Sequence, residues 1–487
     1  MFNRSKNTYL SLIIFVSGIL FSVVLYSQKN YSVNKKYSPL ALKEDTKILR
    51  DVVFAMHPAI GIYEPKSFYE EKFDEFINKL NDSLNEKDFR LRLKLLFDNL
   101  HCGHSEIMLS NAYNKAIRPV ALNFLPYYFA NINNKVFVGR ALNPKKDSLL
   151  KPRSEILKIN SVPVDSIVHY LKRFITGDGY ISSGKSLYMR SGINYYYPSV
   201  FGRPDSFLVE YNQKDKINSN WIKAAKLKNL PYFYLGPKED TTFKKYKHAD
   251  MSVGYLKDKS AMVLKVRSFK AMGYNKVYKK VFKKLEKDKT KNLIIDLRSN
   301  GGGNLANSYK LLTYLMDSTE TITMRTVINK YPFKKYTSGN WAFKLTRWAL
   351  KVTGKKKING DTTFYSEKIK PSKKYHFNSN IYILNNGGTF SASCIIGAYL
   401  KGINRVKIIG TETAGAQEGC NAGITPYYIL PNTKIKARIP AFRIIHDVNP
   451  KINGHGVLPD YEINYTIDDL LKRKDLEMNF VKDLIKN

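Results

Sequence analysis

The sequence predicts an α/β fold with a mixed, mostly parallel sheet, preceded by a helical region and a smaller strand-rich region. In the C-terminal half, short apolar runs alternate with amphipathic segments of about 10–15 residues, the pattern of βαβ units. Two of these apolar runs end in glycine-rich turns, which is where ligands bind to such sheets. With 487 residues, of which 43% are hydrophobic, the chain can form a sizeable core over about three domains.

The N-terminus has the layout of a secretory signal. Arg4 and Lys6 precede an uncharged run over residues 9–26, and Ser27 follows as a candidate cleavage position. The run also reaches the minimum of ~17 residues for a membrane span, so an uncleaved anchor stays an alternative. We therefore assign residues 1–27 to a signal peptide or an N-terminal anchor. Both alternatives export the protein to the periplasm, the cell envelope or the extracellular space.

The charge is strongly basic but unevenly distributed. The formal net charge is +39, and residues 325–376 hold 14 basic against 2 acidic side chains. No nucleic-acid-binding motif accompanies these charges, so we expect no nucleic-acid partner. An anionic membrane or a cell-wall surface is the partner that this charge favours. The three cysteines form neither a disulfide framework nor a CxxC pair, so we expect no metal site.

The elements before residue 231 fall into two regions. Residues 37–115 read as helices, because apolar residues recur at helical spacing over residues 68–84 and 88–100. Residues 116–230 contain alternating, aromatic-rich runs that are typical of strands. Within them we expect a strand at residues 155–159, a tight turn, and a helix from Val164.

Residues 231–487 supply the βαβ pattern. We expect strands at residues 260–266, 292–297, 380–384 and 405–409, and helices at residues 275–287, 305–316 and 391–400. Residues 331–350 combine six aromatic with four basic residues, so we expect a mobile lid or a surface-docking segment there, with a packed helix as the alternative.

Two turns and one loop carry residues that can do chemistry. The turn DLRSNGGG (296–303) presents bare backbone amides, and the turn NNGGTFS (385–391) places Ser391 at the start of a helix. A serine there is either a nucleophile or an ordinary N-cap. His104, in the sequence HCGHSE (101–106), is a candidate base, whereas His101 could be a helix C-cap.

Together, DLRSNGGG (296–303), NNGGTFSASCIIGAYLKG (385–402) and IIGTETAG (408–415) resemble the S41 serine peptidases, which include the carboxyl-terminal processing, tail-specific and tricorn-core enzymes. GHGVLPDY (454–461) is similar to the closing segment of that family. The resemblance implies a ClpP/crotonase-like catalytic core over residues 231–487, with a basic aromatic insertion at 325–376. Residues 149–172 resemble part of a PDZ-like domain, which we place at 116–230.

The resemblance also implies roles for individual residues. Ser391 matches the family nucleophile, and the amides of Ala392 and Gly302 match the oxyanion hole. Some members use a lysine base about 25 residues after the serine, but Ala416 stands in the corresponding stretch, so Gly103-His104 matches the alternative histidine base.

The acid that should orient this histidine is not evident from the sequence. Cys394 stands where the family has a glutamate, and Asn453 stands near the closing motif. Glu418, Asp447 and Asn453 are the candidates.

The expected function is that of a secreted or envelope-associated serine endopeptidase. Its substrates would be peptides and proteins that are unfolded or recognised at the C-terminus, and it would need neither a metal nor an organic cofactor. A weak or inactive peptide-binding relative and a serine esterase are the alternatives. We expect Cys394 and Cys420 to be free thiols. The oligomeric state is left open.

Overall fold

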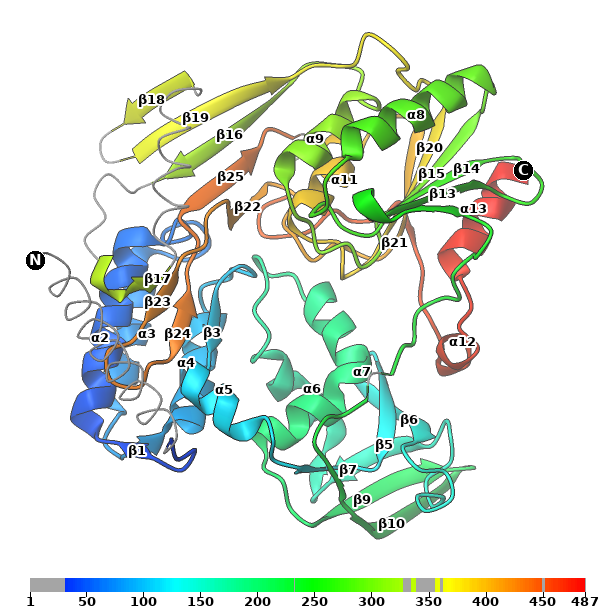
Figure 1. Ribbon diagram of the computed structural model, residues 1–487. Helices are drawn as coiled ribbons and strands as arrows, with labels where there is room; N and C mark the ends of the chain where they lie inside the picture. Colours follow the sequence, from blue (N-terminus) through cyan, green and yellow to red (C-terminus); the bar gives the residue numbers. More distant parts are fainter. Residues whose placement is uncertain are drawn as a thin grey trace, which may run out of the picture.

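The computed structural model describes residues 31–231, 233–326, 334–338, 355–359, 362–448 and 452–486. The expected signal peptide or anchor lies outside these residues, and so does most of the expected lid at 331–350. Within the described ranges, no helix is both long and apolar enough to cross a membrane. Figure 1 shows three lobes: an N-terminal one with blue helices, a cyan and green one, and a larger C-terminal one.

The N-terminal lobe packs helices against a small antiparallel sheet. Its sheet has the order β17-β23-β24-β3, so β3, from the start of the chain, joins three strands from the second half and pairs with β24. Helix faces bury Leu49, Phe89 and Leu93 against Ile435 and Ala437 of this sheet. The elements of this lobe are α2 (Pro39–Met56), α3 (Lys66–Asn78), α4 (Glu86–Asp98), α5 (Asn111–Ile117), β1 (Lys36–Tyr37), β2 (Leu84–Asn85), β3 (Glu106–Met108), η2 (Lys334–Tyr336), β17 (Thr337–Ser338), β23 (Tyr427–Ile429) and β24 (Lys436–Arg438).

The second lobe is a separate strand-rich unit with its own apolar core. Its sheet has the order β10-β9-β7-β6-β5, with β8 paired to β7. The expected strand and helix are found as β7 and α6, and the expected tight turn lies at residues 160–161, before the short strand β8. The elements are β5 (Tyr127–Ile132), β6 (Lys135–Ala141), β7 (Glu155–Ile159), β8 (Val162–Pro163), α6 (Val164–Lys172), α7 (Ser183–Val200), β9 (Ser206–Gln213) and β10 (Lys216–Lys223), with β4 (Leu122–Phe124) paired to β11 (Ala225–Leu227) beside it.

The C-terminal lobe contains the predicted parallel sheet. Its order is β12-β13-β14-β15-β20-β21-β26, and all pairs from β14 to β26 are parallel. The elements are β12 (Lys244–Tyr246), η1 (Lys247–Ala249), β13 (Met251–Tyr255), β14 (Met262–Val266), α8 (Tyr274–Lys287), β15 (Asn292–Asp296), α9 (Leu305–Thr313), β20 (Asn380–Asn385), η3 (Ser391–Ser393), α11 (Cys394–Leu400), β21 (Val406–Gly410), β26 (Tyr461–Glu462), α12 (Ile467–Leu471) and α13 (Leu476–Lys486).

Both faces of this sheet are covered, which explains why its strands read as continuous apolar runs. Ile295 and Ile383 pack toward α8, α9 and α11, whereas Ile294 and Leu384 pack toward the α13 side with Val481. The result is a three-layer core in which the carboxyl ends of β15 and β20 are neighbours. The two glycine-rich turns follow these two strands.

A five-stranded antiparallel sheet was not expected from the sequence. Its order is β18-β19-β16-β25-β22, and it extends from the core toward the N-terminal lobe (Figure 1). Part of the basic insertion at 325–376 forms two of its strands. The strands are β16 (Glu320–Thr326), β18 (Lys355–Asn359), β19 (Thr362–Ile369), β22 (Gly419–Ala422) and β25 (Phe442–His446).

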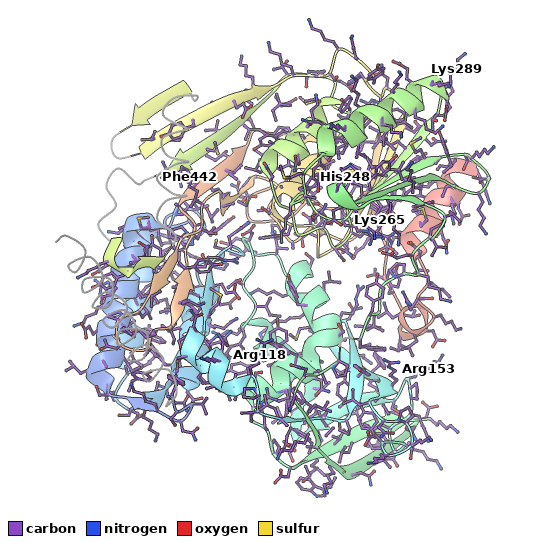
Figure 2. All side chains as sticks on the ribbon, viewed as in Figure 1. Arg118, Arg153, His248, Lys265, Lys289 and Phe442 are labelled. Atoms are coloured by element: carbon purple, nitrogen blue, oxygen red, sulfur yellow. The ribbon has the colours of Figure 1, made fainter. Side chains whose placement is uncertain are left out.

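Basic side chains are found around the outside of the molecule. Arg153 and Lys289 are exposed and lie at the periphery of the second and third lobes (Figure 2).

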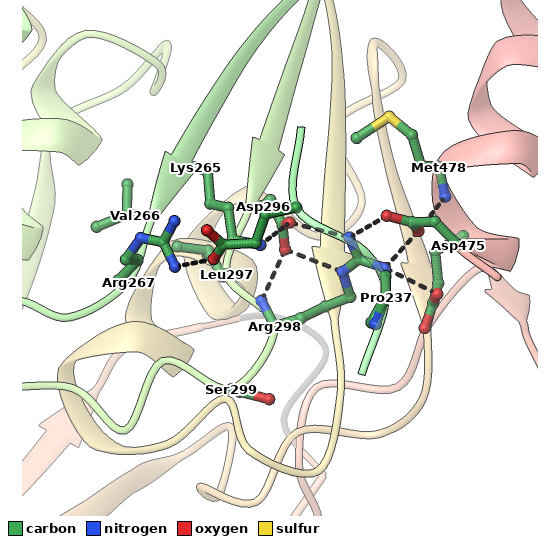
Figure 3. Close-up of polar contacts among 12 residues, drawn as sticks. Pro237, Lys265, Val266, Arg267, Asp296, Leu297, Arg298, Ser299, Asp475 and Met478 are labelled. Carbon is green, nitrogen blue, oxygen red and sulfur yellow. Dashed lines mark hydrogen bonds and ion pairs between the residues drawn. The ribbon is translucent and has the colours of Figure 1, made fainter. Parts of the chain in front are cut away.

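The first glycine-rich turn is anchored by a buried cluster of charges. Arg298 binds Asp296 at 2.9 Å, Asp475 at 2.6 Å and Glu477 at 2.9 Å, so the turn is tied to the start of α13 (Figure 3). The side chains of Arg298, Asp296 and Glu477 are only 8%, 3% and 5% exposed. Burial alone would raise the pKa of Asp296, but the guanidinium outweighs it and lowers this pKa to about 2.

This cluster predicts a large effect of one substitution. Arg298→Ala should lower the free energy of unfolding by about 3–5 kcal/mol, because it leaves two carboxylates buried without their main cation. Urea unfolding measures the loss. The control is Arg267→Ala, which removes the half-exposed pair with Glu239 and should cost no more than about 1 kcal/mol. Equal losses in the two variants would contradict the anchoring role.

Candidate active site

Ser391 lies where β20 ends and the next helical turn begins. Its φ is +56°, in the left-handed region, which costs a non-glycine residue about 1–3 kcal/mol. The residue that caps the helical turn is Phe390, and the hydroxyl of Ser391 makes no capping hydrogen bond. The interpretation of Ser391 as an ordinary N-cap is therefore wrong, and its hydroxyl is available for another contact.

The two glycine-rich turns hold each other in place. Phe390 donates its amide to the carbonyl of Asn300 at 3.0 Å. Ser299 donates its amide to Asn386 Oδ1 at 2.8 Å, and the hydroxyl of Thr389 donates to the carbonyl of Leu297 at 2.9 Å. The strained backbone at Ser391 therefore follows a stretch, residues 386–390, that is fixed by contacts with the other turn.

His104 meets Ser391 from the N-terminal lobe. Its Nε2 lies 3.1 Å from Ser391 Oγ, although 287 residues separate the two. The loop that carries it runs between α4 and β3, and β3 pairs with β24 through Glu106 and Arg438. The imidazole also stacks on the ring of Phe390, with centroids 4.5 Å apart. The sequence-predicted pair is thus brought together at hydrogen-bonding distance.

The electrostatic surroundings keep this imidazole neutral. Burial, and secondarily the charge of Arg438, lower the pKa of His104 to about 3. A neutral imidazole can accept the serine proton, which a charged one cannot. Its other nitrogen, Nδ1, is buried and has no hydrogen-bond partner in the described part of the chain.

One of the two expected oxyanion donors, the amide of Gly302, donates a hydrogen bond within its own turn. The amide of Gly302 donates to Asn300 Oδ1 at 2.9 Å, so this bond would have to break before the amide could bind an oxyanion, and its assignment to the oxyanion hole stays a prediction. The short asparagine side chain forms a local turn that takes up this N–H. The amide of Ala392 lies in the first turn of its helix, where an N–H has no acceptor within the helix.

None of the three candidate orienting residues is hydrogen-bonded to His104 within the described ranges. Glu418 Oε1 instead accepts from Tyr63 at 2.9 Å and from Arg443 at 3.3 Å, because burial requires a charged partner. Asp447 is exposed. Asn453 is also exposed and lines a cavity of ≈ 180 Å³ together with Tyr63, Arg325, Glu418 and Arg443.

Sequence reasoning missed two polar residues beside the histidine loop. Asp178, between α6 and α7, accepts the amide N–H of Gly103 at 2.7 Å. His57, at the end of α2, lies 2.7 Å from the hydroxyl of Ser105. Neither residue belongs to a motif, and Asp178 comes from a different lobe, so only the fold reveals these contacts.

The cysteines and the metal expectation can also be compared with the structure. Cys102, Cys394 and Cys420 are all buried free thiols, as expected for the latter two. Cys394 Sγ donates to the carbonyl of Thr389 at 3.2 Å, so it packs inside the nucleophile turn. In the described part of the chain, no group of three or more potential ligands could hold a metal ion.

Comparisons with known proteins agree with this arrangement. Residues 260–463 match the sequence model of Peptidase family S41. No curated protein matches the chain. Mature CPAF complexed with lactacystin is similar over 92% of this chain and 98% of its own, with a TM-score of 0.60 and 14% identity. A point mutant of CPAF is similar over 92% and 97%, with a TM-score of 0.62 and 13% identity. At such identities the likeness shows the fold alone.

Close packing at Gly302 leads to a prediction. A Cβ at this position would lie 2.7 Å from the carbonyl oxygen of Phe390 and 2.8 Å from Ser391 Cβ, and φ is +88°. Gly302→Ala should therefore displace Ser391 and lower kcat/KM by at least about ten-fold. Gly402→Ala is the control, because its φ is also +88° but nothing lies within 4 Å of its Cβ position. Equal kcat/KM values in the two variants would show that the close approach at Gly302 is unimportant.

Buried histidines lead to a second prediction, on stability. Burial lowers the pKa of His57 to about 3 and that of His446 to about 4, as it does for His104. Unfolded imidazoles titrate near ~6.5, so below that pH the unfolded chain binds more protons than the folded one. Asp178 opposes this with one proton, because burial raises its pKa to about 7. The urea concentration at the unfolding midpoint should therefore decrease as the pH is lowered from 7 to about 4.5. A midpoint that stays constant or increases over this range would contradict the assignment.

Proposed function

We propose that this protein, whose residues 260–463 match the model of Peptidase family S41, is a serine-type peptidase that cleaves peptide bonds by a Ser391–His104 mechanism. The observation that carries the proposal is the contact of 3.1 Å between His104 Nε2 and Ser391 Oγ. A nucleophile and its base need this proximity before any other condition matters.

The proposed reaction has two stages. His104 Nε2 takes the hydroxyl proton of Ser391 while Oγ attacks the substrate carbonyl, and the proton then goes to the leaving amine. A water molecule hydrolyses the acyl-enzyme by the same proton transfers in reverse. The amide of Ala392 faces the developing oxyanion, and a donor of this kind contributes about 3–4 kcal/mol to transition-state stabilisation. The second donor would be an amide of the 301–303 turn that is released from its present contact.

The proposed substrates are extended peptides and unfolded or C-terminally recognised proteins. An α/β site formed by two turns and a loop accepts an extended backbone, and the second lobe, which we interpret as PDZ-like, would bind a chain end by strand addition. The uncharged run at residues 9–26 supports export to the periplasm, the envelope or the medium, with or without an anchor. The basic surface supports contact with an anionic membrane or cell wall.

The test of the proposed function is turnover of an unfolded protein such as casein. Ser391→Ala should abolish it with little change in the thermal midpoint, because a serine-to-alanine change at this turn removes no capping bond. His104→Ala should lower kcat by ~10²–10⁴-fold, the usual contribution of a positioned base. His101→Ala is the matched control in the same loop; its Nδ1 contacts the carbonyl of Gly179 at 2.9 Å, not Ser391.

Two outcomes would overturn the proposed function. If Ser391→Ala retains turnover, another residue is the nucleophile. If the wild-type protein binds unfolded chains but neither cleaves them nor hydrolyses acyl esters, it is a non-catalytic peptide-binding protein. The Nδ1 of His104, which has no hydrogen-bond partner in the described part of the chain, favours this alternative. Hydrolysis of esters alone would identify the esterase.

A further inference from the structure

The loop that carries His104 is held by a segment of another lobe. Residues 178–180 lie between α6 and α7 of the strand-rich unit, and they contact the loop at three points. Gly179 donates its amide to the carbonyl of His101 at 3.0 Å, and its own carbonyl lies 2.9 Å from His101 Nδ1. Asp178 Oδ1 accepts the amide N–H of Gly103 at 2.7 Å. The stretch directly before the base is therefore held at His101 and at Gly103.

Asp178 differs from the other carboxylates that join the lobes. It is only 1% exposed, and its Oδ2 is buried with no hydrogen-bond partner within the described ranges. The guanidinium that acts on it, that of Arg443, is itself hydrogen-bonded to Glu418 at 3.3 Å. Burial accordingly raises the pKa of Asp178 to about 7. A carboxyl group kept in the interior without a cation of its own destabilises the fold, and groups of this kind are concentrated at functional sites.

His104 likewise has a buried polar atom without a hydrogen-bond partner in the described part of the chain. Its Nδ1 is buried and unpartnered in the described part of the chain, while its Nε2 faces Ser391. When the imidazole takes the serine proton it becomes a cation in a site that disfavours cations. A nearby carboxylate stabilises this cation and selects the ring tautomer with the proton on Nδ1. Within the described ranges, none of the three residues that the sequence suggested for this role is hydrogen-bonded to the ring.

The same carboxyl group also reaches the nucleophile side of the site. The backbone N–H of Ala416 lies near this carboxyl group and, like that of Gly103, acts to lower its pKa, although burial outweighs both. Ala416 follows Gly415, whose Cβ position would lie 3.1 Å from the backbone nitrogen of Ser391. The Asp178 side chain thus lies between the base loop and the segment beside the nucleophile.

We propose that Asp178 is the positioning residue of the Ser391–His104 pair, which holds the base loop through Gly103 and supplies the negative charge that the protonated imidazole requires. The proposal rests on the proposed function and deepens it, because it assigns the missing acid to the strand-rich lobe.

The competing explanation is that Asp178 is only a tether between lobes. Asp98 provides the matched control, because it lies three residues before His101 and its Oδ1 binds Lys185 Nζ of α7 at 2.5 Å. Asp98→Asn removes the negative charge from a contact between the same two lobes without touching Gly103. Asp178→Asn keeps the volume and an oxygen that can accept from Gly103, but it removes the negative charge.

The experiment measures kcat, KM and thermal midpoint for the exported full-length protein and these two variants. Asp178→Asn should lower kcat more than ten-fold with KM within about three-fold, whereas Asp98→Asn should change kcat less than three-fold. Added formate should partly restore kcat in Asp178→Ala, and chloride at equal ionic strength should not; this readout holds even where the asparagine variant folds poorly. In ¹⁵N-histidine spectra, the His104 proton should reside on Nδ1 in the wild type.

Several results would overturn the proposal. The first is a decrease in kcat of less than ten-fold in Asp178→Asn, together with no rescue of Asp178→Ala by formate. The second is a decrease in kcat in Asp98→Asn that equals the decrease in Asp178→Asn. If the wild type is active and Ser391→Ala is inactive, either result contradicts only the role of Asp178 and leaves the proposed function standing. If the wild type neither turns over substrate nor reacts with a fluorophosphonate at Ser391, both this proposal and the proposed function fail.

Discussion

The contact between His104 and Ser391 is the constraint on which the rest of the structure depends. It joins residues 287 positions apart, so it exists only if the N-terminal lobe and the core are held in a fixed relation. The pairing of β3 with β24 provides that relation, because it joins the histidine loop to a strand that follows Ser391 in the chain. The helices of the N-terminal lobe stabilise the sheet that contains these two strands by packing their apolar side chains against it.

The nucleophile side is fixed by strain that the surrounding structure compensates. Ser391 has a left-handed backbone that a serine does not favour on its own. Hydrogen bonds between the two glycine-rich turns hold it there, and the buried cluster around Arg298 ties the first of these turns to α13. Part of the folding energy of the core is therefore used to present one hydroxyl group to one imidazole. Such a site is preorganised, which is the property that catalysis requires.

Much of the core could be predicted from the sequence, because buried parallel strands and their amphipathic helices leave strong periodic patterns. The turn at Ser391 and the loop at His104 were also recognisable, since each carries a short motif. The antiparallel sheet was not predicted, because strands such as β18 (KKKIN) are polar, lack helical spacers and resemble loops. Asp178 was missed for a different reason: a single acid in a region that suggests peptide binding carries no local signal, and its role is defined only by the residues it meets in the fold. The hydrogen bond from the Gly302 amide to the Asn300 side chain could not be predicted either, because it depends on the conformation of that side chain.

The central claim is that the fold activates Ser391 in particular, among all the hydroxyl groups of the chain. The most direct measurement is to react the native protein with a fluorophosphonate and to map the modified residue by mass spectrometry. The account predicts a single adduct on the peptide that contains Ser391, and no adduct on that peptide in the His104→Ala variant. An adduct on another serine, or labelling of Ser391 that does not depend on His104, would contradict it.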